Sequence, residues 1–129
     1  RLLDLKLLTG LTTSEINQRV MYQILVEGRY RKHMEKIRTR LEIKRGQVIS
    51  KLEACGLTVY AEPAGGMFVW AQLTDEGNAA EIATIASRRN IMLAPGNLFS
   101  PHQAPSSWLR FNVAHCDDER IFEILSTFK

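Results

Sequence analysis

The chain has 129 residues, of which 45% are hydrophobic, and its formal net charge is +3. This size fits one domain, and the hydrophobic share excludes a disordered chain. No apolar run is long enough to cross a bilayer and no signal-peptide pattern is present, so we expect a cytoplasmic protein with no membrane partner. The two cysteines lack histidines at metal-ligand spacing, which predicts reduced, buried thiols and no metal site.

The first part of the chain is helical in pattern. It begins at Arg1 with the leucine-rich stretch RLLDLKLLTGL, which would normally pack on preceding structure, so we expect the chain to be a piece of a longer protein. A helix is expected at 13–27, where TTSE supplies a cap and an early acid. A longer helix is expected at 30–54, because apolar residues from Tyr30 onward recur at steps of three and four.

The rest of the chain alternates between strand and helix patterns. Two strands, a helix, two more strands and a closing helix are expected, in this order, at 57–60, 67–73, 79–89, 91–96, 108–114 and 117–129. Asp117 is the expected cap of the closing helix. This order predicts an α+β fold, a two-layer sandwich in which helices cover one face of a small sheet. The other face of the sheet then needs an occupant.

The last strand carries the most informative residue. Side chains alternate between the faces of a strand, so Leu109, Phe111 and Val113 are expected to point toward the helices. Arg110 then stands on the open face between Trp108 and Asn112. Its planar donor fork matches a carboxylate or a phosphate, although the pattern by itself favours a solvated arginine.

The other candidate features have structural explanations. Gly65 and Gly66 precede a buried strand and fit a turn, and Gly96 fits a strand end. The stretch 29–45 holds eight Lys or Arg residues, which suggests nucleic acid, but its apolar spacing favours the wet side of an amphipathic helix. His33 adjoins the apolar stripe and is expected to pack there. Phosphate-binding glycine loops, nucleophile elbows and zinc spacings are absent from the sequence.

Four motifs in order resemble a known family. These are GRYRKHMEKIRTRLEIKRGQVISKLE, PAGGMFVW, IMLAPGNLF and WLRFNVAH. Together they resemble the C-terminal small domain of fold-type I pyridoxal-phosphate aminotransferases, which has a mostly antiparallel sheet. The resemblance implies that residues 1–28 are a connecting segment and first helix leading from a missing large domain. Residues 29–129 would then be the small domain.

The pattern at Gly28, Tyr30, His33 and Arg38 resembles the GntR-type regulators of the MocR subfamily. In those proteins a winged-helix domain precedes the aminotransferase-like part. We therefore expect a regulator that senses the cofactor and an amino-acid-like ligand and binds DNA through a missing N-terminal domain. The alternative is a class I or II aminotransferase, and a free-standing basic nucleic-acid-binding module ranks last.

The resemblance also assigns a role to one residue. In the family, the arginine of the LR strand binds the α-carboxylate of the amino acid, and Arg110 matches it. The lysine that bonds pyridoxal 5'-phosphate is expected upstream of Arg1, since Lys6 has the wrong context. We therefore expect no catalytic or cofactor-binding residue in this chain and no catalysis by the chain alone. The longer parent, expected to be a homodimer, would carry the cofactor.

Overall fold

The computed structural model describes residues 2–10, 14–61, 63–73 and 77–128. The chain divides into two compact units, Arg1–Ile37 and Arg38–Lys129. The N-terminal unit holds α1 (Leu2–Gly10), α2 (Glu15–Val26) and the first turns of α3 (Arg29–Ala54). The C-terminal unit holds the rest of α3, followed by β1 (Thr58–Val59), β2 (Phe68–Gln72), α4 (Ala79–Ser87), β3 (Ala94–Pro95), η1 (Gly96–Phe99), β4 (Trp108–Asn112) and α5 (Glu119–Ser126).

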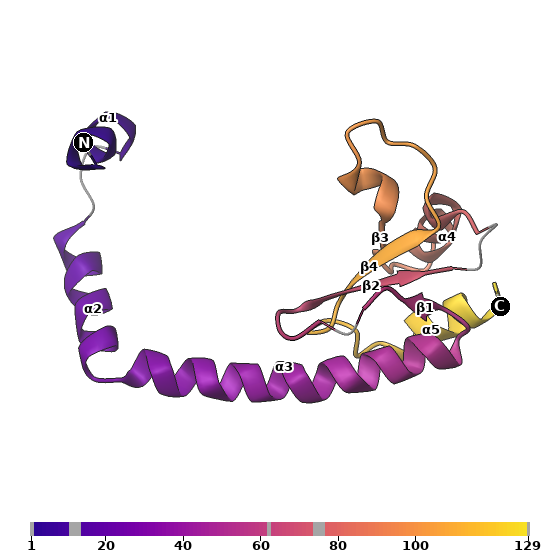
Figure 1. Ribbon diagram of the computed structural model, residues 1–129, viewed down its shortest axis with the longest axis horizontal. Helices are drawn as coiled ribbons and strands as arrows, with labels where there is room; N and C mark the ends of the chain where they lie inside the picture. Colours follow the sequence, from indigo (N-terminus) through magenta and orange to yellow (C-terminus); the bar gives the residue numbers. More distant parts are fainter. Residues whose placement is uncertain (1, 11–13, 62, 74–76, 129) are drawn as a thin grey trace. The chain divides into compact units, whose positions relative to one another are not determined.

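The described strands form one antiparallel sheet in the order β1-β2-β4-β3 (Figure 1). The long pairing lies at the centre, where Phe68 faces Asn112 and Gln72 faces Trp108. At the β3 edge, Ala94 is opposite Arg110. Each central strand has five residues, and β1 and β3 have two each. The two strong strand patterns therefore make the sheet, and the brief strand expected at 91–96 contributes only two paired residues.

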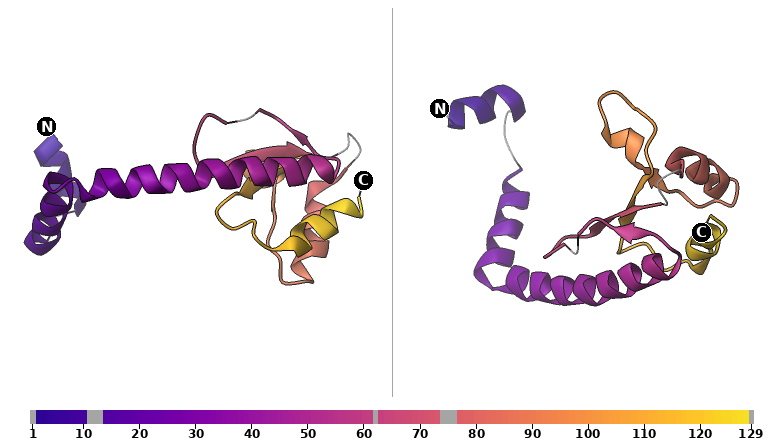
Figure 2. Two further views of the ribbon diagram at one scale, coloured as in Figure 1. Left: turned by 90° about the horizontal axis from the view of Figure 1, so that it is seen from below. Right: turned by 45° about the vertical axis from the view of Figure 1, so that its right-hand side comes forward.

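The helices of the C-terminal unit cover one face of this sheet. Figures 1 and 2 show α5 and the end of α3 on one side of the strands and η1 on the other. Leu109, Phe111 and Val113 are buried, as their alternation predicts. They pack with side chains of α3, α4 and α5, among them Val48, Leu52, Ile82, Ala86, Ile121, Ile124 and Leu125. The expected α+β class, with helices on one face of a small sheet, is confirmed.

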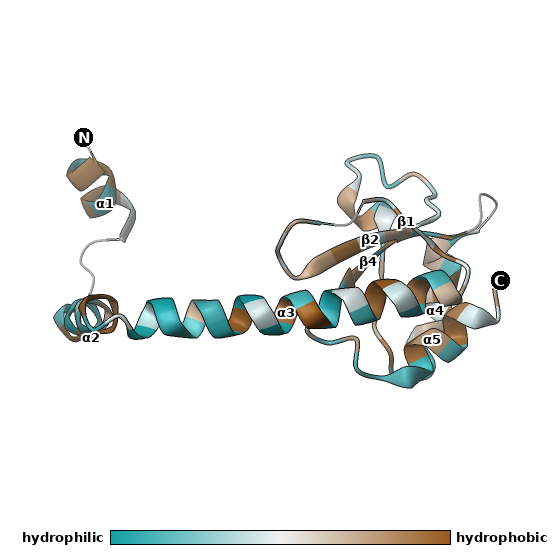
Figure 3. Cartoon of the chain, turned by 60° about the horizontal axis from the view of Figure 1, so that its bottom comes forward, coloured by the Kyte–Doolittle hydropathy of each residue, from teal (hydrophilic) through white to brown (hydrophobic). Residues whose placement is uncertain are grey.

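Only the second half of α3, from Leu41 onward, contributes to the core described here. A helix of 26 residues is about 39 Å long, whereas a five-residue strand spans roughly 17 Å, so the strands can cover only part of it. Val48 and Leu52 are buried, but Tyr30 is 48% exposed and His33 is exposed. The expected packing of His33 is therefore wrong, and Tyr30, where the apolar spacing begins, is not buried either. Figure 3 shows hydrophilic colour dominating the first half of this helix.

The N-terminal unit exposes its apolar side chains. In α1, Leu2 and Leu8 are more than four-fifths exposed, and α2 has no buried residue. Figure 3 shows α1 as largely hydrophobic. The expected helix start at Thr13 lies outside the described residues; α2 begins at Glu15 after Ser14, whose side chain makes no capping bond. Within the described residues, no helix combines the length and apolarity needed to cross a membrane.

The last helix is capped by Asp118, which corrects the expectation that Asp117 is its cap. The Asp118 carboxylate accepts a hydrogen bond from the Arg120 backbone N–H at 3.0 Å, and α5 begins at Glu119. Asp117 instead pairs with Lys44 of α3, with 2.5 Å between Nζ and Oδ2. Two consecutive aspartates satisfy the local capping rule, and the structure places Asp118 in the cap and Asp117 in an ion pair with α3.

Replacing Asp118 with alanine is expected to lower the Tm by a few degrees, because α5 loses its N-cap. The hydrogen bonds from the Arg120 side chain and backbone lower the pKa of Asp118. Its contribution to stability is thus present above the usual carboxyl pKa and is lost as the pH falls through the lowered value. Thermal melts of Asp118→Ala and wild type should therefore converge in acid. Asp117→Ala is the control, and an equal or larger loss in it would contradict the assignment.

Candidate functional site

The open face of the sheet carries one cation among aromatic and amide side chains. Alternation in β2 and β4 places six residues on the face opposite the core: Phe68, Trp70, Gln72, Trp108, Arg110 and Asn112. Arg110 is opposite Trp70 across β2 and opposite Ala94 across β3. It therefore stands in the middle of the sheet, not at an edge. The predicted placement of Arg110 on the open face agrees with the alternating burial of β4.

The guanidinium of Arg110 lies over two phenyl rings. Its Cζ is 4.3 Å from the centre of the Phe68 ring and 4.1 Å from that of Phe99, the last residue of η1. A cation at such distances is attracted by the ring faces. Phe99 also packs edge-on against Trp70, with ring centres 5.2 Å apart. Aromatic side chains therefore hold the charged group in place.

Arg110 makes no ion pair or hydrogen bond through its side chain within the described part of the chain. Its Nε is buried and has no hydrogen-bond partner, whereas the two Nη nitrogens are not among the buried unpartnered atoms. Both rings lie close to Cζ, and the Nη nitrogens, which have no partner among the described residues, remain available as donors. Two parallel N–H donors fit a carboxylate, with both oxygens accepting. The arrangement thus leaves an uncompensated donor pair on the open face.

Sequence reasoning found Arg110 but missed the two rings beside it. Phe68 could have been found. It lies two residues before Trp70 in the same strand, so its side chain points to the same face as those of Trp70 and Arg110. Phe99 could not, since it follows Pro95 and Gly96 in a stretch expected to be an irregular loop, where no periodicity assigns a direction. The short 3₁₀ helix Gly96–Phe99 gives this residue its position.

Gly66 and Gly96, for which structural roles are expected, lie against other residues of this chain. Gly66 adopts a φ of +85°, which disfavours other residues, and its carbonyl accepts a hydrogen bond from Arg45 Nη1 at 3.3 Å. Gly96 lies against Ser106 and Trp108, so close that a Cβ would clash. Their neighbours are parts of this chain, which agrees with a role in packing.

The basic residues of α3 are mostly exposed to solvent, as their spacing predicts, with one exception. Arg29, Arg31 and Lys32 are exposed, but Arg45 is only 8% exposed and anchors the turn before β2. Arg45 also lines a hollow beside this turn with Arg38 and Glu42. Because the hollow contains both charge signs and Arg45 already has a backbone partner, it is a weaker candidate than Arg110.

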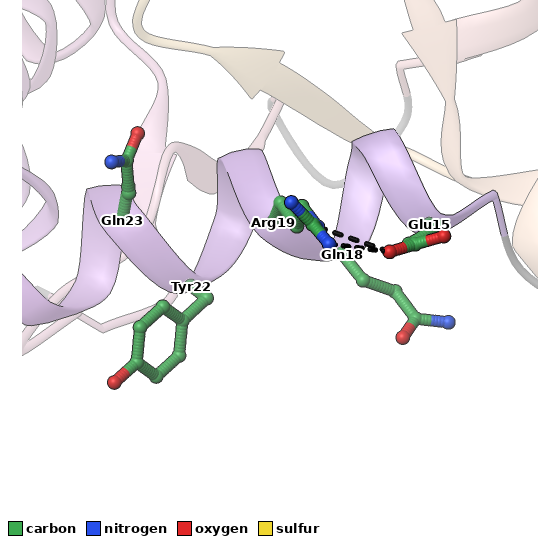
Figure 4. Close-up of a pocket in the computed structure, with 5 residues that line it drawn as sticks. All are labelled: Glu15, Gln18, Arg19, Tyr22 and Gln23. Carbon is green, nitrogen blue, oxygen red and sulfur yellow. Dashed lines mark hydrogen bonds and ion pairs between the residues drawn. The ribbon is translucent and has the colours of Figure 1, made fainter.

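The described lining of a second hollow comes from α2 alone. Its lining residues are Glu15, Gln18, Arg19, Tyr22 and Gln23. Figure 4 shows Arg19 paired with Glu15 along the helix, while Gln18 and Tyr22 point away from the ribbon. The described residues of this hollow lie along one helix surface and do not enclose a ligand site. Among the described residues, no group of three His, Cys, Asp or Glu side chains could hold a metal ion.

Both cysteines are free and buried, as expected. Burial, reinforced by the nearby Asp117 carboxylate, raises the pKa of the Cys116 thiol to about 11. We expect iodoacetamide at pH 7.5 to label folded protein far more slowly than urea-unfolded protein, because the thiolate is the reactive form. The raised pKa also predicts that stability falls as the pH rises from about 9 toward 11. Equal labelling rates, measured by mass spectrometry, would contradict this assignment.

Comparison with known proteins relates this arrangement to a family. The family model for aminotransferase class I and II matches residues 5–128. The chain is 28% identical over 121 residues to an uncharacterized HTH-type transcriptional regulator, YdfD, of Bacillus subtilis, covering 92% of this chain and 25% of the relative. It is 29% identical over 128 residues to the 2-aminoadipate transaminase of Thermus thermophilus, covering 95% and 31%.

A solved structure shows the same fold. The crystal structure of Pyrococcus horikoshii kynurenine aminotransferase superposes with a TM-score of 0.76 at 27% identity, covering 95% of this chain and 31% of that one. The chain thus spans between a quarter and a third of the length of these proteins. The family match extends over nearly every element described above, from α1 to the end of α5. On this evidence, the chain belongs to the aminotransferase class I and II family.

Proposed function

We propose that Arg110 binds the carboxylate of an amino-acid-like ligand in a larger, aminotransferase-like protein. The observation that carries this proposal is the unpaired guanidinium on the open face, with its Nη nitrogens free of partners among the described residues. A buried or half-buried charge without a partner is costly, which favours a site that an anion completes. Two parallel hydrogen bonds would fix both the position and the orientation of the carboxylate.

We further propose that the parent is a transcription regulator of the GntR type, MocR subfamily. The likeness to YdfD and the pattern at Gly28, Tyr30, His33 and Arg38 support this. Residues 1–28 would connect to a large domain of the same chain, and residues 29–129 would be the small domain. A winged-helix domain at the N-terminus would bind DNA, and the parent would act as a homodimer in the cytoplasm.

The family implies pyridoxal 5'-phosphate in the parent, but the open face does not fit this cofactor. Its six residues include no lysine to bond an aldehyde and no carboxylate to pair with a pyridine nitrogen, and Arg110 is their one cation. Lys44 and Lys51 lie in ion pairs between α3 and the start of α5. We therefore assign the cofactor to the rest of the parent. The part proposed for this chain is to hold and orient the ligand's carboxylate.

The experiment uses the full-length protein that carries this chain. A regulator should bind DNA from its own promoter region, measured by fluorescence anisotropy, and L-phenylalanine, used as a probe that carries an α-carboxylate, should change that affinity. It should transaminate L-phenylalanine with 2-oxoglutarate slowly or not at all. Absence of a winged-helix segment upstream, or of DNA binding at low salt, would reject the regulator.

An aminotransferase is the second candidate, and the likeness to 2-aminoadipate transaminase favours it. The role of Arg110 would be the same, because a carboxylate must be oriented in either case. Brisk turnover of amino acid and keto acid by purified full-length protein, without DNA binding, would select this alternative. The two candidates thus differ in one measured rate and one measured affinity.

A further inference from the structure

Two phenylalanines approach Arg110 from opposite sides of its strand. In the sheet order, β4 lies between β2 and β3. Phe68 belongs to β2, and Phe99 ends the 3₁₀ helix that directly follows β3. Both rings lie under the same guanidinium, at 4.3 and 4.1 Å from its Cζ. The cation is therefore held between a ring from each neighbouring element.

We propose that Phe68 and Phe99 are positioning residues that present the Nη edge of Arg110 to the ligand's carboxylate. The inference rests on the proposed function of Arg110. An arginine side chain on a solvated strand face has many rotamers, and ordering it upon binding lowers affinity. Two rings this close to Cζ restrict these rotamers before a ligand arrives. They also leave the Nη N–H groups, which have no partner among the described residues, as the donors that an anion can reach.

The position of Phe99 is itself fixed by packing. Its ring meets Trp70 edge-on at 5.2 Å, and Trp70 is the cross-strand neighbour of Arg110. The segment that carries Phe99 begins at Gly96, which lies against Ser106 and Trp108. Phe99 and Phe68 are 43% and 41% exposed, so the pair is held at the surface of the open face. The clamp is thus part of the fold and does not need a ligand to form.

The test compares a carboxylate with its amide in the full-length protein. Calorimetry gives the dissociation constants of L-phenylalanine and L-phenylalaninamide, and their ratio measures the preference for the carboxylate. Phe68→Leu and Phe99→Leu keep apolar bulk but remove the ring. We expect each to lower the ratio by about 3- to 10-fold, because the arginine side chain would then have to be ordered when the carboxylate binds. Phe99→Tyr retains a ring and should keep the ratio.

Tyr60→Leu is the matched control. Tyr60 is an exposed aromatic residue that packs edge-on against Trp108 and not over Arg110, so its loss should leave the ratio unchanged. A purely structural role of the two rings would weaken both ligands equally, which would overturn the inference. If Arg110→Ala removes the carboxylate preference while both leucine variants keep it, the inference fails and the proposed function stands. If wild type shows no preference, both fail.

Discussion

Arg110→Ala in the full-length protein is expected to weaken binding of L-phenylalanine by about 10- to 100-fold. Hydrogen bonds to a charged group contribute about 1.5–3 kcal/mol, and tenfold in affinity corresponds to about 1.4 kcal/mol. The wild-type guanidinium is stabilised by two rings but by no acid in the described structure, so its removal leaves no buried carboxylate unpaired. We therefore expect the fold to persist, which circular dichroism can check.

Two further variants separate geometry from charge. Arg110→Lys keeps the positive charge but replaces a planar fork with a point donor, so affinity should fall to an intermediate value. Arg89→Ala removes the same charge from an exposed position after α4 and should leave binding unchanged. Unchanged affinity in Arg110→Ala would show that the carboxylate binds elsewhere and would remove the proposed function.

The second large effect is expected at Gly96. An alanine Cβ there would lie 2.6 Å from Ser106 Oγ and 3.1 Å from both the Cβ and the carbonyl oxygen of Trp108. The serine hydroxyl can rotate, but it accepts a hydrogen bond from the Trp108 N–H, and the backbone of β4 cannot yield without disturbing the sheet. Overpacking of this kind costs about 1–3 kcal/mol. Gly96→Ala should lower the free energy of unfolding by that amount, measured in urea.

Gly46→Ala is the matched control, because no heavy atom beyond its own helix lies within 4 Å of the added Cβ. In the interior of α3 this exchange should instead stabilise the protein by about 0.5–1 kcal/mol. Since Gly96 leads into the segment carrying Phe99, Gly96→Ala should also weaken L-phenylalanine binding. A Gly96→Ala protein as stable as wild type would show that the space between Gly96 and β4 accommodates a methyl group.

Gly96 shows both what can be predicted from the local sequence and what cannot. Gly96 sits at a strand end marked by the adjacent proline, so a structural role could be expected from local chemistry alone. Its contacts with Ser106 and Trp108 could not, because they join residues ten and twelve positions apart through an irregular loop. The cap of α5 is a similar case: two adjacent aspartates satisfy the local rule equally, and the pairing of Asp117 with Lys44 is a contact between distant segments.

The long helix α3 shows another limit of prediction from sequence. The apolar spacing of α3 is regular from Tyr30 to Leu52, so periodicity predicts one continuous buried stripe. Burial depends on how far the opposing elements extend, and within the C-terminal unit the core reaches α3 only from Leu41 onward. Periodicity records which residues share a face, and it carries no information on what covers that face.

The sequence by itself determined the class of the fold, the central strands and the face on which Arg110 stands, because these follow from alternation and helical spacing within short segments. The tertiary structure alone decided that the guanidinium is free of acids and clamped by Phe68 and Phe99. Those contacts depend on the order β1-β2-β4-β3, which brings together residues 68, 99 and 110. Strand order is set by packing across the whole sheet, and local patterns do not encode it.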